Sequence, residues 1–288
     1  MTGEDGDPAN AMHCASLVRD GDFERYAATL FVKPDLRRAL LALYAFNLEI
    51  ARIREHISQP LAGEIRLQWW SDLLAGIAHG EAAGNPVAAE LLRAIERHCL
   101  PRQPFERLIE AHRFDLYDEP MQTRAELENY LQGTASALFA LGAHVLDADA
   151  QPDDELLQHA GLALGLVRIA EALPRHASRG QLYLPLAELG EAGVAVEALF
   201  AGKSSPQLQR YLQDLAGEAR QHLEQALGRL LVTDTPARKV YLPLALIERR
   251  LRQLTSPVYQ PFAVQPAQSN LSVLWTLWRA SRREPFRS

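Results

Sequence analysis

Four pairs of carboxylates lie four residues apart in the chain, a spacing that puts both side chains on one face of a helix. They are Asp20/Glu24, Glu106/Glu110, Asp115/Glu119 and Asp214/Glu218, with His222 one turn beyond the last pair. Carboxylates that face a cavity in this way can hold Mg²⁺ against a diphosphate. Glu106/Glu110 and the Asp214 set, however, lie opposite the apolar stripes of their helices, which favours solvated faces over a metal site. Asp115, between Phe114 and Leu116, is the acid most worth following.

The most unusual segment of the chain runs from Ala172 to Pro185. Pro174 is expected to end the preceding helix, and Arg175, His176 and Arg179 follow it at once. These basic side chains could bind an anion, or they could satisfy the last carbonyl groups of the helix. The residues alone leave both interpretations open.

Composition and cysteine usage exclude several other classes of site. The sequence has no Gly-x-Ser-x-Gly elbow, no glycine-rich phosphate loop and no His-Glu-x-x-His pair. Its 30 Lys and Arg against 36 Asp and Glu give a net charge of -6, which argues against nucleic-acid binding. Cys14 and Cys99 lack metal-ligand spacing, so we expect small buried side chains in a reducing compartment.

Helical periodicity extends over the whole chain. Apolar residues from Leu36 to Ile57 recur every three or four positions, and the alternation typical of strands is missing. A capping residue followed by proline, as at Asn85-Pro86 and Ser205-Pro206, marks helix starts. We expect helices at 22–31, 35–57, 61–79, 86–99, 104–117, 124–147, 153–172, 205–231, 237–254 and 270–280. No linker or repeat divides them, so the chain is predicted to be one all-α bundle.

Several short segments resemble the two signature regions of the squalene/phytoene synthase family. They are Tyr44-Ala45-Phe46, Gly161-Leu162-Ala163, Arg179-Gly180 and Tyr183-Leu184-Pro185, together with Asp115. The resemblance runs from about Asp20 to Tyr259 and implies the isoprenoid synthase fold, an all-α single-domain bundle with a central cavity. On this basis we expect a flexible segment at 1–15, a squalene/phytoene synthase-like helical domain at 16–262, and an amphipathic helix with a basic tail at 263–288.

The resemblance implies that active family members carry two aspartate pairs, which hold Mg²⁺ while two prenyl diphosphates are joined head to head. Here the first pair falls on Ala51 and Glu55, and the second on Ala172 and His176. Alanine supplies no ligand, and neutral imidazole suits Mg²⁺ poorly, so we expect no catalytic and no metal-binding residue. The degenerate first motif comprises Tyr44, Asn47, Ala51 and Glu55, and the degenerate second motif comprises Arg168, Ala172 and His176.

Three further positions depart from the family pattern that the resemblance implies. Leu48 stands where the family has a phosphate-binding arginine, and Arg168 stands where an asparagine usually helps to bind metal. Asp20-Gly21 lies near the position of a His-Ser pair that contacts the diphosphate. Arg168, Arg175, Arg179 and Tyr183 are nevertheless candidates for binding an anionic ligand.

A narrower resemblance is to the non-catalytic branch that complex I assembly factor 6 represents. It rests on Ala45–Ala51, Arg66–Trp70 and Ala172–Arg179. It implies an accessory or assembly factor whose partners are respiratory complex I subunits or assembly intermediates, with a prenyl or lipid ligand and no cofactor. The first alternative is an active prenyltransferase with Glu55 and acids such as Asp20 or Asp115 around Mg²⁺. The second is a binding module for a hydrophobic metabolite.

Two tryptophan pairs are candidates for contacts with a partner or a membrane. Leu271, Leu274, Trp275 and Trp278 form a helical stripe, followed by Arg279, Arg282, Arg283 and Arg287. This stripe could contact an anionic membrane, but docking onto the bundle is the preferred interpretation. Of Trp69 and Trp70, one is expected to face inward and the other a rim or partner.

The first ten residues resemble neither a signal peptide nor a mitochondrial presequence, and the stretch Thr134–Leu146 is too short to span a bilayer. We therefore expect a cytoplasmic protein, peripheral at most to the inner membrane.

Overall fold

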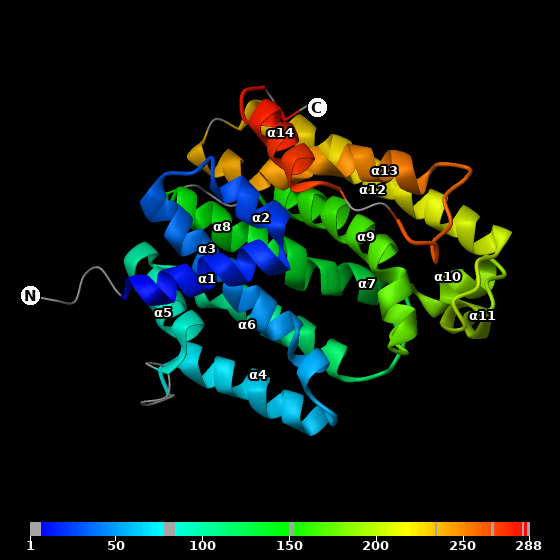
Figure 1. The fold of residues 1–288 in the computed structure, drawn as a ribbon, viewed down its shortest axis with the longest axis horizontal. Coiled ribbons are helices and arrows are strands. Elements are labelled where there is room, and N and C mark those ends of the chain that lie inside the picture. Colours follow the sequence, from blue (N-terminus) through cyan, green and yellow to red (C-terminus); the bar gives the residue numbers. More distant parts are fainter. Residues whose placement is uncertain are drawn as a thin grey trace, which may run out of the picture.

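The computed structural model describes residues 7–77, 84–149, 153–233, 235–265, 268–283 and 285–286. All the regular structure in these ranges is helical, and they contain no strand. The predicted all-α fold class is therefore confirmed. The helices pack as one bundle, with α4 along one edge and α14 on the opposite side (Figure 1).

The elements of the N-terminal half are α1 (Pro8–Gly21), α2 (Phe23–Thr29), α3 (Pro34–Ala51), the 3₁₀ turn η1 (Ile53–His56), α4 (Pro60–Ala75), α5 (Pro86–His98), α6 (Arg102–Arg113), the 3₁₀ turn η3 (Phe114–Leu116) and α7 (Arg124–Leu131). The C-terminal half contains the π-helical turn η4 (Gln132–Ser136), α8 (Ala137–Leu146), α9 (Asp154–Ser178), α10 (Leu186–Glu191), α11 (Val196–Phe200), α12 (Pro206–Val232), the 3₁₀ segment η5 (Pro236–Leu246), α13 (Ile247–Leu254) and α14 (Asn270–Ala280).

The central helix of the bundle is α9, which packs along α12 and against η4 and α8 (Figure 1). By length and composition it is the one helix in the described ranges that could cross a membrane, but 67% of its apolar window is buried inside the bundle. Such burial is typical of a core helix, and we interpret α9 as one.

The N-terminal prediction of a flexible segment at 1–15 is wrong from residue 8 onward. Asp7 caps α1 by accepting a hydrogen bond from the Ala9 amide at 2.8 Å, and Pro8 occupies the first turn. Cys14 and Val18 are buried where α1 packs against α3 and α5. Burial of this one narrow face therefore orders the segment. Residues 1–6 lie outside the described ranges.

The expected end of a helix at Pro174 is also wrong, because α9 continues through this proline to Ser178. Proline removes one backbone donor from the helix, but Leu173 and Ala177 are buried on either side of it. Hydrogen bonds from the Arg179 and Gln181 amides to the His176 carbonyl close the helix end. Arg175 and His176 consequently lie in the last helical turn rather than in a loop.

Four predicted helices are each divided. The helix expected at 104–117 ends in the 3₁₀ turn η3, and the π-helical turn η4 interrupts the one expected at 124–147. The segment expected at 35–57 ends as α3 at Ala51 and continues after Arg52 as η1. The segment expected at 237–254 begins as 3₁₀ helix around Pro243 and becomes α13 only at Ile247. The short helices α10 and α11 were not expected at all. Cys14 is buried as predicted, whereas Cys99 is exposed; it occupies the left-handed residue that ends α5, at a φ of 50°.

Candidate functional site

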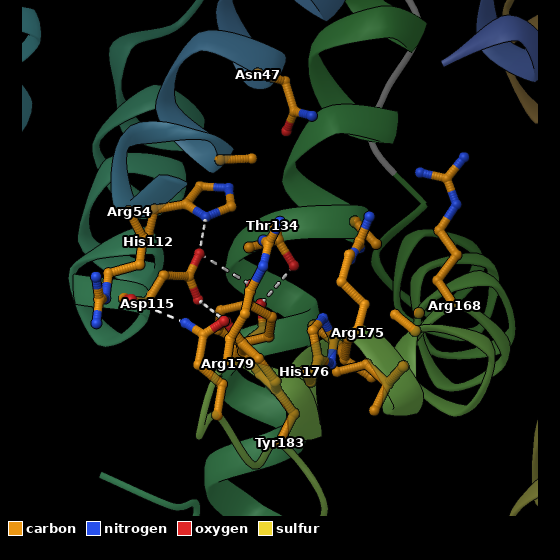
Figure 2. A pocket seen from close by; sticks show the side chains of 18 of the residues that line it. Asn47, Arg54, His112, Asp115, Thr134, Arg168, Arg175, His176, Arg179 and Tyr183 are labelled. Carbon is orange, nitrogen blue, oxygen red and sulfur yellow. Dashed lines mark hydrogen bonds and ion pairs between the residues drawn. The ribbon is translucent and has the colours of Figure 1, made fainter. Parts of the chain in front are cut away.

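A cavity of about 240 Å³ lies in the bundle between α3, η1, η3, η4 and α9 (Figure 2). Its lining residues combine five arginines with two acids, two histidines and two tyrosines. The residues are Arg25, Asn47, Ala51, Arg54, Glu55, His112, Asp115, Tyr130, Leu131, Thr134, Ala135, Gly165, Arg168, Ile169, Ala172, Arg175, His176, Arg179, Gln181 and Tyr183.

The structure brings almost all the sequence-predicted site residues to this one cavity. From the first motif Asn47, Ala51 and Glu55 line it, and from the second motif Arg168, Ala172 and His176 do so, together with Arg175, Arg179 and Tyr183. Arg168 and Arg175 extend from α9 toward the end of the cavity that Asn47 lines (Figure 2). Tyr44 is the exception, because it lies behind Arg25, whose guanidinium carbon is 5.6 Å from the Tyr44 ring centre.

Asp115, which the sequence marked as worth following, is the centre of a buried hydrogen-bond network. Its carboxylate lies 2.6 Å from His112 Nδ1 and accepts hydrogen bonds from the Tyr183 hydroxyl at 2.6 Å and the Tyr130 hydroxyl at 3.3 Å. Gln181 donates to the Asp115 carbonyl at 3.2 Å. Both carboxylate oxygens of this acid are therefore engaged by neighbouring side chains of the wall.

The same network leaves one polar atom of the wall without a partner. His112 Nε2 is buried and makes no hydrogen bond within the described part of the chain. Burial, and next the charge of Asp115, raise the pKa of Tyr130 and of Tyr183 far above the ordinary value. Both phenols therefore stay protonated and act as hydrogen-bond donors.

A buried ion-pair cluster forms the next part of the wall. Asp22, the N-cap of α2, accepts hydrogen bonds from Arg25 at 2.9 Å and from Arg168 at 3.1 Å. Burial disfavours the charged carboxylate, yet Arg168 and Arg25 outweigh this effect and hold the pKa of Asp22 at about 2. Glu24 also pairs with Arg168, at 3.7 Å, and with Arg250. Arg168 is thus neutralised by acids of α2.

The last turn of α9 carries the least neutralised cation of the cavity. Arg179 donates a hydrogen bond to Glu55 at 2.6 Å, so the charges of these two side chains neutralise each other. Burial would raise the pKa of Glu55, but the hydrogen bond from Arg179 and the charges of Arg179, Arg175 and Arg52 together outweigh burial and lower this pKa. Arg175 has no acidic partner within salt-bridge distance among the described residues. Burial, followed by the charge of Arg175, lowers the pKa of His176 to about 4, so its ring is neutral at pH 7.

The other carboxylate pairs from the sequence lie outside the cavity. Asp20 is exposed beside Arg19, and Glu106, Glu110, Glu119 and Asp214 are exposed as well. Glu218 and His222 differ from the expected solvated face. Glu218 lies 3.3 Å from Arg124, and His222 lies 2.8 Å from His159 between their ring nitrogens. In the described residues no group of three His, Cys, Asp or Glu could hold a metal ion.

Leu48 lines a different pocket, of about 300 Å³, with Arg52, Trp69 and Trp70. Trp70 is the inward residue of the tryptophan pair, packed edge to face on Phe46 at 4.9 Å, and Trp69 is partly exposed at the rim. The predicted division between the two tryptophans is confirmed.

The donor set of the cavity does not fit magnesium. Mg²⁺ takes oxygen ligands in octahedral geometry, usually carboxylates completed by water and phosphate. Ala51 and Ala172 offer no donor, and the imidazole of His176 is a poor ligand for a hard cation. Glu55 is occupied by Arg179, and Asp115 by His112 and Tyr183.

Sequence comparison with a family model places the chain among known proteins. The model described as squalene/phytoene synthase matches residues 18–279, nearly the whole chain. The chain belongs to the squalene/phytoene synthase family. This confirms the resemblance seen in its signature segments, and it agrees with the isoprenoid synthase architecture of the bundle.

The curated relatives fall into two groups. Complex I assembly factor 6 of Mus musculus is 27% identical over 98% of this chain and 84% of its own length, and that of Homo sapiens is 27% identical over 95% and 82%. A chloroplastic phytoene synthase of Arabidopsis thaliana is 28% identical over 82% of this chain and 58% of its own.

Among solved structures, a dehydrosqualene synthase with ligand aligns with a TM-score of 0.79 at 18% identity, covering 94% of this chain and 96% of the other. A squalene synthase of Alicyclobacillus acidocaldarius aligns with a TM-score of 0.69 at 22% identity, covering 84% and 92%. These alignments establish the shared fold.

Sequence reasoning did not identify several residues of the cavity wall, namely Arg25, Arg54, His112, Tyr130 and Gln181. His112 and Tyr130 carry a usable signal, because each lies at helical spacing from an apolar stripe close to Asp115. Arg25 carries no such signal. Its burial depends on Asp22 and Tyr44, which only the folded bundle brings to it.

Proposed function

We propose that this protein is a non-catalytic accessory factor in the assembly of respiratory complex I. The observation that carries the proposal is the donor set at the four positions where the family resemblance puts aspartates. These positions, Ala51, Glu55, Ala172 and His176, line one cavity and supply a single carboxylate, which Arg179 already binds at 2.6 Å. The mouse and human assembly factor 6 proteins, which match 95% or more of the chain, support the same role.

The physical argument concerns the leaving group. Ionising a prenyl diphosphate requires metal ions that act as Lewis acids on a group carrying several negative charges. Guanidinium groups can bind such an anion, but binding alone does not favour the transition state over the bound substrate. A cavity that has five arginines but only one carboxylate at these four positions is thus suited to holding an anion rather than to ionising it.

We further propose that the cavity holds the phosphate or diphosphate group of a prenyl or lipid ligand through Arg175. Its guanidinium has no acidic partner within salt-bridge distance among the described residues, and Tyr183 and His112 contribute polar atoms to the same cavity lining. Arg175 is exposed at the cavity, and charge-assisted hydrogen bonds to phosphate oxygens are stronger than those between neutral groups. The neutral ring of His176 beside Arg175 adds no negative charge at that position.

A two-part experiment tests the accessory role. Purified protein with Mg²⁺ and farnesyl or geranylgeranyl diphosphate is expected to give no condensation product above the uncatalysed background, measured by radiolabelled product extraction. Deletion of the gene in its own host is expected to lower NADH oxidation by complex I in isolated membranes.

The deletion is expected to be complemented equally by the wild type and by Glu55→Gln, which removes the one carboxylate at the four positions. Turnover at the rate of a true synthase would contradict the proposal, and so would a complementation that Glu55→Gln abolishes together with product formation. Unchanged complex I activity after deletion would contradict the assembly role itself.

A further inference from the structure

The C-terminal helix α14 docks on the bundle by one face only. Val273, Leu277 and Ala280 are its buried residues, and they pack against η5 and α2. Ser269 caps the helix by accepting from the Ser272 amide, and Arg249 of α13 donates to the Ser272 hydroxyl at 3.0 Å. The helix is therefore fixed along the outer side of the bundle, far from α4 (Figure 1).

Of the predicted stripe of α14, only Leu274 packs against the core. Leu271, Trp275 and Trp278 remain 79%, 62% and 38% exposed, whereas the preferred expectation was that this stripe would pack on the bundle. The two indole rings stack on one another with centroids 4.9 Å apart and point outward as one apolar surface. Two neighbouring exposed tryptophans are unusual on a monomer, and indole rings prefer the boundary between water and lipid headgroups.

The charged residues of α14 and of the turn after it, as far as Arg283, are all basic. Arg279, Arg282 and Arg283 are exposed directly after it, and the Arg282 guanidinium lies 4.4 Å from the Trp278 ring centre. From Asn270 to Arg283 the sequence has no acidic residue, in a chain whose net charge is -6. The patch is thus a local positive exception on an acidic protein. Arg287, which was expected to extend it, lies outside the described residues.

We propose that the outer face of α14 binds the surface of an anionic lipid bilayer. This face is formed by Leu271, Trp275, Trp278, Arg279, Arg282 and Arg283. Charge complementarity and the chemistry of the rings favour an anionic bilayer as the partner. Indole rings enter the headgroup region, while arginines contact lipid phosphates. The buried face holds the helix to the bundle, so the protein attaches as a folded body and α14 lies in the plane of the surface.

The number of arginines in the patch sets the expected strength of membrane binding. Each arginine near an anionic surface contributes about 1 kcal/mol, and the attraction falls within a Debye length, so the attachment is reversible and salt-sensitive. Replacing three arginines should accordingly weaken binding about a hundredfold.

The experiment is co-sedimentation of the full chain with vesicles of phosphatidylcholine and phosphatidylglycerol in roughly equal parts, compared with phosphatidylcholine alone. The wild type is expected to sediment with the anionic vesicles at low salt, and to be released at high salt. Both Trp275→Ser/Trp278→Ser and Arg279→Gln/Arg282→Gln/Arg283→Gln are expected to remain in solution. Because every replaced side chain is exposed, each variant should keep the wild-type circular dichroism spectrum and melting temperature.

The matched control is Leu61→Ser/Ile65→Ser on α4, which removes two equally exposed apolar side chains from the far side of the bundle. It should bind anionic vesicles like the wild type. The proposal is overturned if the wild type does not bind, if it binds neutral vesicles as well as anionic ones, or if the arginine variant binds normally. Self-association through the tryptophans without vesicle binding, seen by sedimentation velocity, would overturn it too.

Discussion

His176 illustrates how one residue type changes the chemistry of the cavity. A carboxylate at this position would add a negative charge beside Arg175 and Arg179, whereas the neutral ring adds none. Its ring lies 4.5 Å from that of Tyr183, so the side chain also packs as part of the wall. An aspartate at position 176 would be a metal ligand. The histidine found there instead separates Arg175 from Arg179 without adding a charge.

The lowered pKa of His176 makes a prediction for stability against pH. The pKa is about 4 in the folded protein and 6.5 ordinarily, so between these values the unfolded chain binds a proton that the folded chain does not. Stability is therefore lost as the pH falls through this range. From pH 7 to roughly pH 4.5, the wild type should lose about 2 kcal/mol more than His176→Gln, measured by urea unfolding.

The control for this prediction is His13→Gln, which removes an exposed histidine of α1. Its pH profile should follow that of the wild type. Parallel profiles for the wild type and His176→Gln would show that His176 does not titrate as the cavity geometry requires.

At the scale of elements, the site depends on the close approach of α9 to η4. Gly161 of α9 lies against Ser136, so that an added Cβ would be 1.9 Å from the Ser136 hydroxyl and 2.8 Å from its backbone nitrogen. Thr134 and Ala135 of the same π-helical turn line the cavity opposite Arg168 and Ala172. Because Gly161 has no side chain, α9 can lie this close to η4. This contact fixes the distance between the two cavity walls.

Two glycine substitutions in helices of the same bundle should have opposite effects. Gly161→Ala should lower the free energy of unfolding by about 2–3 kcal/mol, because the contact with Ser136 includes backbone that cannot move aside. Gly217→Ala, on α12 with nothing within 4 Å of the added Cβ, should raise it by about 0.5–1 kcal/mol through helix propensity. Urea unfolding of both variants measures the change in the free energy of unfolding. Equal changes in the two variants would contradict the close contact between Gly161 and Ser136.

The elements also show what sequence patterns can and cannot predict. Apolar periodicity located most of the long helices, because an amphipathic helix must bury one face. It did not locate α1, where burial of Cys14 and Val18 is enough, nor the passage of α9 through Pro174, where packing on both sides outweighs one lost hydrogen bond. It also favoured the wrong face of α14, since Val273 and Leu277 are as apolar as the exposed stripe.

For the whole molecule, the family fold was predictable and the ion pairing was not. Signature segments spread from Tyr44 to Pro185 were enough to place α3 and α9 at one cavity. The partners of Arg168 and Arg179, however, lie 146 and 124 residues away in sequence, and only the folded bundle brings them together. The charge balance of the cavity is therefore a property of the complete fold.

The central claim is that neutral side chains and one arginine-paired glutamate occupy the positions where a synthase would hold metal. A crystal soaked with Mn²⁺ and farnesyl thiodiphosphate tests it most directly, because manganese is located by its anomalous scattering. The account predicts a diphosphate held at Arg175, lost in Arg175→Gln, with no manganese between α3 and α9. Two or three manganese ions bound there, bridging the diphosphate to Glu55 or Asp115, would contradict it.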